Sequence, residues 1–157
     1  AGAAARRATG AAVSTGRKHR TEIEVRWGDQ DTYQHVNNVA YAAYLQEARA
    51  ELLAAAGVRA SAHARHGTFV VARLKVNYLR QLTFRPAPIA VTTWVSAMSP
   101  ARITLRSEVS EPVDDGLGPY CTALTVLVPY DLDEDFPRRV SEEERTALSH
   151  FLVPDPD

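Results

Sequence analysis

Between Gly28 and Asn38 the chain gathers polar side chains that can do chemistry, among them two carboxylates, an imidazole and the carboxamides of two asparagines. Asp29 and Asp31 are separated by one residue, and His35 follows four residues after Asp31. A carboxylate can act as a nucleophile or general base, and an imidazole can transfer a proton. This polar turn therefore predicts acyl transfer or hydrolysis.

Two elements flank the turn. Thr21–Trp27 alternates polar and apolar residues, which predicts a half-buried strand. Val39–Ala56 has no Gly or Pro and predicts a helix about 27 Å long. Asn37 or Asn38 can cap its start, and Gly57 can end it. The unpaired N–H groups at the helix N-terminus, with the positive end of the helix dipole, can stabilise a developing oxyanion.

The run GDQDTYQHVNNVAYAAYLQEAR, residues 28–49, resembles the signature of hotdog-fold thioesterases of the 4-hydroxybenzoyl-CoA thioesterase type. That signature is a strand, Asp-x-Asp, a His-Val-Asn-Asn-like turn and a long helix. The QHVNN part, residues 34–38, is also similar to plant acyl-ACP thioesterases. The resemblance covers roughly residues 21–130. It implies an α+β fold in which an antiparallel five-stranded sheet wraps around one long central helix.

The resemblance also implies roles for residues of the turn. Asp31 stands where the family has its catalytic carboxylate, although an Asp here could merely stabilise a turn. The backbone N–H of Asn38 stands at the position that polarises the thioester carbonyl. His35 matches a histidine of the plant-type catalytic network, but Tyr33 replaces the Asn found there two residues earlier, so His35 is either a catalytic partner or a turn-stabilising residue. Asp29 is expected to be structural.

Charge is distributed unevenly along the chain. Residues 52–107 contain no Asp or Glu but eight Arg or Lys residues. Arginine binds phosphate through paired hydrogen bonds, so part of this region could hold the nucleotide end of coenzyme A; the alternative is a set of solvated strand faces. The three candidates for that contact are Arg80, Arg85 and Arg102.

Two tyrosines and one charged pair lie on the predicted helix. Tyr41 and Tyr44 could line an acyl pocket or belong to the core. Glu47 and Arg49 are expected to form a solvated or interface pair. Cys121, the single cysteine, lies in an apolar run and is expected to be a core residue.

Four more strands are predicted after the helix, at 68–79, 89–97, 102–109 and 120–128. In the first of these strands, one face is expected to hold Val70, Ala72, Leu74, Val76 and Tyr78. Residues 131–157 are acidic, with nine Asp or Glu against three Arg. They include a capping box from Ser141 to Glu144 that opens a short helix reaching about His150.

The length of 157 residues and a hydrophobic content of 45% fit one globular domain. We expect a tail at 1–20, the hotdog domain at 21–130 and a linker with a short helix at 131–157. The tail has five basic residues and no acidic one, but no apolar segment follows Arg6 and Arg7 as a secretory signal requires, so a cytoplasmic protein is expected.

Together these features predict an acyl-CoA thioesterase that needs no cofactor or metal. An acyl-ACP thioesterase and a non-catalytic acyl-CoA-binding hotdog protein remain alternatives. We expect a homodimer or dimer of dimers, because the turn and one helix face would otherwise be exposed. No nucleic-acid or membrane partner is expected, because the net charge is −1 and no apolar run approaches ~20 residues.

Overall fold

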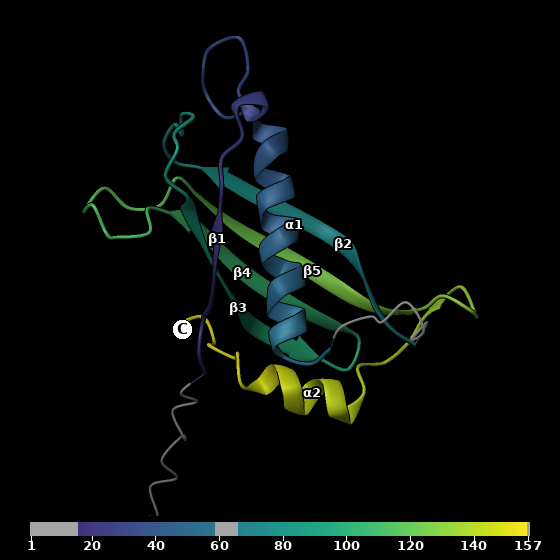
Figure 1. Cartoon of the computed structure of the whole chain (residues 1–157). Coiled ribbons are helices and arrows are strands. Elements are labelled where there is room, and N and C mark those ends of the chain that lie inside the picture. Colours follow the sequence, from purple (N-terminus) through teal and green to yellow (C-terminus); the bar gives the residue numbers. More distant parts are fainter. Residues whose placement is uncertain (1–15, 59–65, 157) are drawn as a thin grey trace, which may run out of the picture.

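The structure, a computed structural model, describes residues 16–58 and 66–156. Its elements in chain order are β1 (His19–Ile23), the 3-10 turn η1 (Trp27–Asp29), α1 (Asn38–Ala55), β2 (His66–Tyr78), β3 (Ile89–Ser99), β4 (Arg102–Ser110), β5 (Cys121–Asp131), β6 (Phe136–Pro137) and α2 (Glu142–Ser149). The antiparallel sheet has the order β1-β3-β4-β5-β2, with the two-residue β6 paired to β5. The sheet curves around α1, and α2 lies below the C-terminal end of α1 (Figure 1). The predicted hotdog architecture is confirmed.

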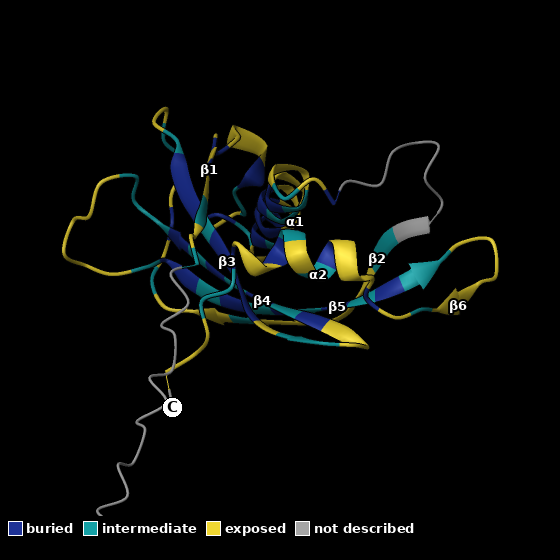
Figure 2. Cartoon of the chain, turned by 90° about the horizontal axis from the view of Figure 1, so that it is seen from below, coloured by how far each residue is buried: buried dark blue, intermediate teal, exposed yellow. Residues whose placement is uncertain are grey.

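The alternation of β4 determines which face of the sheet is buried. Ile103, Leu105, Ser107 and Val109 are buried, whereas the residues between them are partly exposed. α1 turns a matching stripe toward this face, spaced three or four residues apart: Tyr41, Tyr44, Leu45, Ala48 and Leu52. The resulting core lies between helix and sheet (Figure 2).

Both ends of α1 are fixed by the predicted residues. The side chain of Asn37 accepts a hydrogen bond from Val39 N at 2.9 Å and is the N-cap. At the other end Gly57 has φ +75°, and its N–H donates to Ala54 O. Val58 N also donates to Leu53 O, which completes a Schellman motif that only a residue tolerant of positive φ allows.

The edge strand β2 differs from the sequence prediction. A register shift between Val71 and Arg73 inserts one extra residue relative to β5. Leu74 pairs with the buried Thr125, so it lies on the helix side, whereas Val70 pairs with the half-exposed Val128 on the outer face. The prediction that Val70 shares a face with Leu74 is therefore wrong, because a single-residue bulge reverses the alternation.

The chain ends extend the domain beyond the predicted boundaries. The predicted tail at 1–20 lies mostly outside the described residues, but His19 and Arg20 already belong to β1. The predicted capping box is confirmed, since Ser141 accepts from Glu144 N and the Glu144 carboxylate accepts from Ser141 N. Residues 151–153 continue the edge beside β3, where Val95 N donates to Phe151 O and Val153 N to Val95 O.

Candidate active site

The polar turn between η1 and α1 is closed by its own backbone. Asp31 N donates to His35 O at 2.9 Å, and Gln34 N donates to Asp31 O at 3.0 Å. Gln34 has φ +62°, a left-handed conformation that reverses the chain. Just outside this loop, Gln30 and Val36 form an antiparallel bridge. The backbone therefore holds Asp31 and His35 side by side.

The Asp31 carboxylate is held at one oxygen. Its Oδ1 accepts the backbone N–H of Tyr33 at 2.8 Å and, more weakly, that of His35 at 3.4 Å. Within the described residues, Oδ2 has no hydrogen-bond partner. The residue is half-buried. Asp31 thus has one oxygen oriented by the turn and a second that can meet a substrate or a water.

Asp29 has a different environment. It is only 6% exposed and accepts hydrogen bonds from Tyr44 Oη at 2.6 Å and from Arg26 N and Nε at 3.0 Å each. Burial alone would raise its pKa, but the hydrogen bonds from Tyr44 and Arg26 outweigh burial and leave the pKa lowered. Asp29 therefore anchors the polar turn to α1 as a charged carboxylate.

The first turn of α1 provides a free donor. Asn37 N donates to Asp29 O at 2.8 Å, which ties the cap to the Asp29 anchor. Asn38 N, the next donor along, has no hydrogen-bond partner in the described part of the chain. Asn38 O accepts the hydroxyl of Tyr78 at 3.2 Å. An unpaired N–H at the positive end of a helix suits a developing oxyanion.

His35 meets Asp31 through its main chain. Its N–H donates to the carboxylate, and its carbonyl accepts Asp31 N–H. The described residues show no hydrogen bond to its half-buried imidazole. These main-chain contacts favour the turn-stabilising alternative, and the catalytic role of the ring stays a prediction.

The predicted acyl-pocket tyrosines lie in the core. Tyr41 and Tyr44 are each 3% exposed. Burial, followed by nearby groups such as Cys121, raises the pKa of Tyr41 to about 12, so its phenol stays neutral. Tyr78 is 51% exposed and lies edge-on to Tyr41, with 5.2 Å between the ring centroids. The sequence analysis placed Tyr78 on the same strand face as Leu74 and Val76 but missed its link to the helix N-terminus.

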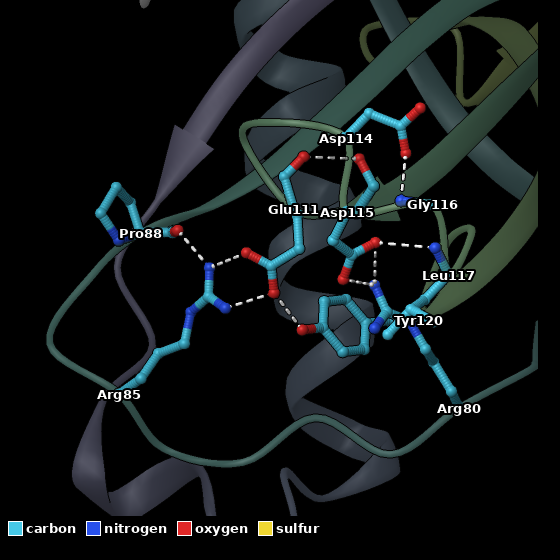
Figure 3. A network of polar contacts seen from close by, with 10 residues as sticks. Arg80, Arg85, Pro88, Glu111, Asp114, Asp115, Gly116, Leu117 and Tyr120 are labelled. Atoms are coloured by element: carbon cyan, nitrogen blue, oxygen red, sulfur yellow. Dashed lines mark hydrogen bonds and ion pairs between the residues drawn. The ribbon is translucent and has the colours of Figure 1, made fainter.

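The three candidate arginines differ in their partners and in their positions in the sheet. Arg80 forms an ion pair with Asp115 at 3.0 Å, and Arg85 forms a two-pronged pair with Glu111 (Figure 3). Both lie at the end of the sheet that carries the polar turn, because Tyr78, just before Arg80, contacts Asn38. Arg102 begins β4, whose nine residues span about 27 Å. It follows Pro100, whose carbonyl accepts Val140 N beside α2, so it lies at the opposite end.

Other chemistry receives little support. Cys121 is fully buried, and burial raises its pKa to about 12, so its thiol is a core group as predicted. Across residues 16–58 and 66–156, no three His, Cys, Asp or Glu side chains are grouped to hold a metal ion. None of the described helices is long and apolar enough to cross a membrane.

Comparison with known proteins gives a consistent result. The sequence model of the thioesterase-like superfamily matches residues 25–148. A predicted thioesterase from Bacillus stearothermophilus shares the fold, with a TM-score of 0.78 at 18% identity over 89% of this chain and 100% of that chain. DHNA-CoA thioesterase from Staphylococcus aureus has a TM-score of 0.68 at 26% identity, covering 78% of this chain and 80% of its own. A thioesterase from Thermus thermophilus, complexed with coenzyme A and Zn, has a TM-score of 0.69 at 25% identity, covering 82% of this chain and 90% of its own.

Proposed function

We propose that this chain, which belongs to the thioesterase-like superfamily and is a thioester hydrolase, acts on acyl-CoA thioesters. Asp31 would carry the reaction. The products would be a carboxylic acid and free coenzyme A. An acyl-ACP is the alternative substrate, because the residues around Asp31 would contact the thioester group and not the coenzyme A or ACP to which it is attached.

One observation carries this proposal: Asp31 and the free Asn38 N–H belong to the same rigid turn. Asp31 would take a proton from a water whose oxygen adds to the thioester carbonyl, and the resulting oxyanion would accept Asn38 N–H. Collapse of the intermediate would expel the thiolate, which takes up the proton. Direct attack by Asp31 on the carbonyl carbon would instead expel the thiolate and form a mixed anhydride, which water hydrolyses to the carboxylic acid and the free Asp31 carboxylate. His35 would serve both routes through its main-chain N–H.

The carrier would be held by the basic end of β2. Arg80 is the best placed of the three candidate arginines, because it lies beside the polar turn and one of its guanidinium nitrogens, Nη2, makes its contacts with Asp115. Arg85 is bound at both nitrogens by Glu111, and Arg102 lies at the far end of β4. Two of the similar thioesterases have names or bound ligands that involve coenzyme A, which favours this carrier over ACP. Tyr78, backed by Tyr41, would flank the acyl group.

A homodimer would complete the site. β2 is an edge strand that exposes apolar side chains, with Val71 at 44% and Leu74 at 40%. Arg49 supports a partner subunit on the side of α1 that faces away from β1. It lies about 200° around the helix from Glu51, which contacts Thr21 of the opposite edge strand β1.

Arg49 is half-buried, and desolvation lowers its pKa. Among the described residues no carboxylate pairs with it, and Glu47 does not do so as the sequence suggested. A carboxylate of a partner subunit would pair with this guanidinium. Pairing of β2 with its copy would cover both the apolar edge and this side of α1.

The test is thiol release from a panel of acyl-CoAs that spans short, long and aromatic acyl groups. Hydrolysis of at least one member is expected, and release of thiol from none would argue for the non-catalytic binding protein. Comparison with 3′-dephospho-CoA thioesters separates the carriers. If Arg80 binds phosphate, Arg80→Ala should raise KM for the intact thioester more than it lowers kcat. Sedimentation of the wild-type protein at micromolar concentration tests the dimer, and a stable active monomer would contradict it.

A further inference from the structure

Residues 79–88, which link β2 to β3, lie directly against the polar turn. Leu82, only 2% exposed, accepts the backbone N–H of Val36 through its carbonyl at 2.7 Å. Phe84 N donates to the side chain of Gln30 at 3.4 Å. Val36 follows His35 and precedes the cap of α1. The Leu82 carbonyl therefore supports the turn between Asp31 and the N–H of Asn38, the two groups proposed to act on the substrate. Asp29 anchors the turn on its other side.

The same linker is fastened on its far side by the loop between β4 and β5. Arg85 donates to both carboxylate oxygens of Glu111, and it also donates to Ala87 O at 3.2 Å and Pro88 O at 2.8 Å. The Tyr120 hydroxyl donates to the same carboxylate. Figure 3 shows this carboxylate between the guanidinium and the phenol. Arg85 thereby bends the linker around itself and fixes it to Glu111.

A second pair reinforces the first. Arg80 pairs with Asp115 at 3.0 Å and lies over the Tyr120 ring, 3.9 Å from its centroid. Tyr120 O accepts N–H groups of both Leu79 and Arg80. Tyr120 is therefore held by contacts of its backbone, ring and hydroxyl. The carboxylate of Glu111 accepts hydrogen bonds from both the Tyr120 hydroxyl and Arg85.

The charge state agrees with this geometry. The hydrogen bond from Arg85 is the largest influence on Glu111 and lowers its pKa against the opposing effect of burial. Burial raises the pKa of Tyr120, and the hydrogen bond to Glu111 raises it further. Near neutral pH the carboxylate is charged and the phenol neutral, which is the pairing that the contacts require.

We propose that Glu111 is a positioning residue of the thioesterase reaction, acting through Arg85 and the Leu82 carbonyl on the polar turn. The inference rests on the proposed function. Glu111 touches neither Asp31 nor Asn38, yet it fixes the linker that holds the turn between them. Small displacements of catalytic groups are costly, since a shift of about 1 Å can lower a rate ~10²-fold.

The decisive variant is Glu111→Gln, which keeps the size of the side chain but replaces one acceptor oxygen with a donor and removes the charge. The fold offers a matched control in Glu144, which is buried at α2 and receives Arg138 through two hydrogen bonds of 2.9 and 2.7 Å. Glu144→Gln breaks a comparable pair far from the polar turn. Both variants should lose thermal stability.

Only Glu111→Gln should change the site. At a temperature well below both melting points, its kcat per folded molecule should fall ~10–100-fold with KM within about threefold, whereas Glu144→Gln should keep the wild-type kcat. Hydrogen exchange of the Val36 amide should accelerate at least tenfold in Glu111→Gln and not in the control. If Glu111→Gln does not fold, Tyr120→Phe removes the hydroxyl that donates to the same carboxylate. This variant should show a smaller fall in kcat and a smaller acceleration of Val36 exchange.

Equal kcat and equal Val36 exchange in Glu111→Gln and wild type would overturn the proposal. So would an equal loss of kcat in Glu144→Gln, because the effect would then be one of general stability. The exchange measurement does not depend on activity. If the wild-type protein released no thiol, the proposed function would fail while the connection from Glu111 to Val36 would still be tested.

Discussion

Replacing Asp29 should separate stability from catalysis within one turn. Asp29 is buried beneath the polar turn and accepts hydrogen bonds from Tyr44 and from the main chain and side chain of Arg26. Asp29→Asn removes the charge and turns one acceptor oxygen into a donor. Tyr44 Oη–H and Arg26 N–H both donate to Oδ2, and Arg26 Nε–H donates to Oδ1, so either orientation of the new amide leaves at least one of these donors without an acceptor.

The expected cost follows from these contacts. A buried polar group left unsatisfied costs about 1–3 kcal/mol. The guanidinium of Arg26 is largely exposed, so its contact adds little. A loss of about 2 kcal/mol should lower the melting temperature by about 4–8 °C in a chain of this size. Tyr44→Phe, which leaves Asp29 its two contacts with Arg26, should cost less.

The assay combines denaturant unfolding with turnover at 25 °C. Asp29→Asn should unfold at clearly lower denaturant concentration, yet its kcat should stay within about tenfold of wild type, because the main-chain carbonyl of residue 29 still accepts Asn37 N–H and keeps the turn joined to the start of α1. An unchanged unfolding midpoint would refute the structural role of Asp29. A loss of kcat above ~10²-fold at unchanged stability would show that the wrong carboxylate has been assigned to catalysis.

Three further outcomes are expected. Asp29, Glu111 and Glu144 all have lowered pKa values. Their contribution to folding stability is therefore complete at pH values above the ordinary carboxyl pKa of ~4, and it is lost as the pH falls through their lower pKa values in the folded state. The free energy of unfolding measured from pH 7 to 3 should show this decline, and a flat profile would contradict it. Leu74→Lys places a charge on the exposed edge of β2 and should convert the proposed dimer to monomer in sedimentation without unfolding the chain. His35→Ala should lower kcat less than about tenfold, because the main-chain bonds of residue 35 survive the substitution; a fall of ~10²–10⁴ would make the imidazole a working acid or base.

The sequence predicted the features that depend on neighbours along the chain. The alternation of β4 gave its buried face, and Asn37, Gly57 and Ser141 ended or began helices where their types favour it. The polar turn was also predictable, since the hydrogen bonds of Asp31 all reach residues within four positions.

What escaped prediction depends on contacts between distant residues. Arg85 was assigned to phosphate because no acidic residue lies near it in sequence, but its partner Glu111 is 26 positions away. The sequence placed Tyr78 on one face of its strand but did not show that its hydroxyl reaches Asn38 O, 40 positions away. The face of Val70 was wrong because the bulge in β2 is visible only when β5 is paired beside it. Such pairings are set by the fold and leave no mark in local composition.

The central claim is that the free oxygen of the Asp31 carboxylate does the chemistry. Asp31→Asn keeps the size of the side chain and an acceptor for Tyr33 N–H, but removes the charge that a base or nucleophile needs. The most direct measurement is thiol release by the folded Asp31→Asn protein on the best acyl-CoA substrate of the wild type. We predict a fall in kcat of at least ~10²–10⁴ with KM little changed and an unfolding midpoint near that of wild type. A folded Asp31→Asn protein with wild-type kcat would contradict the mechanism.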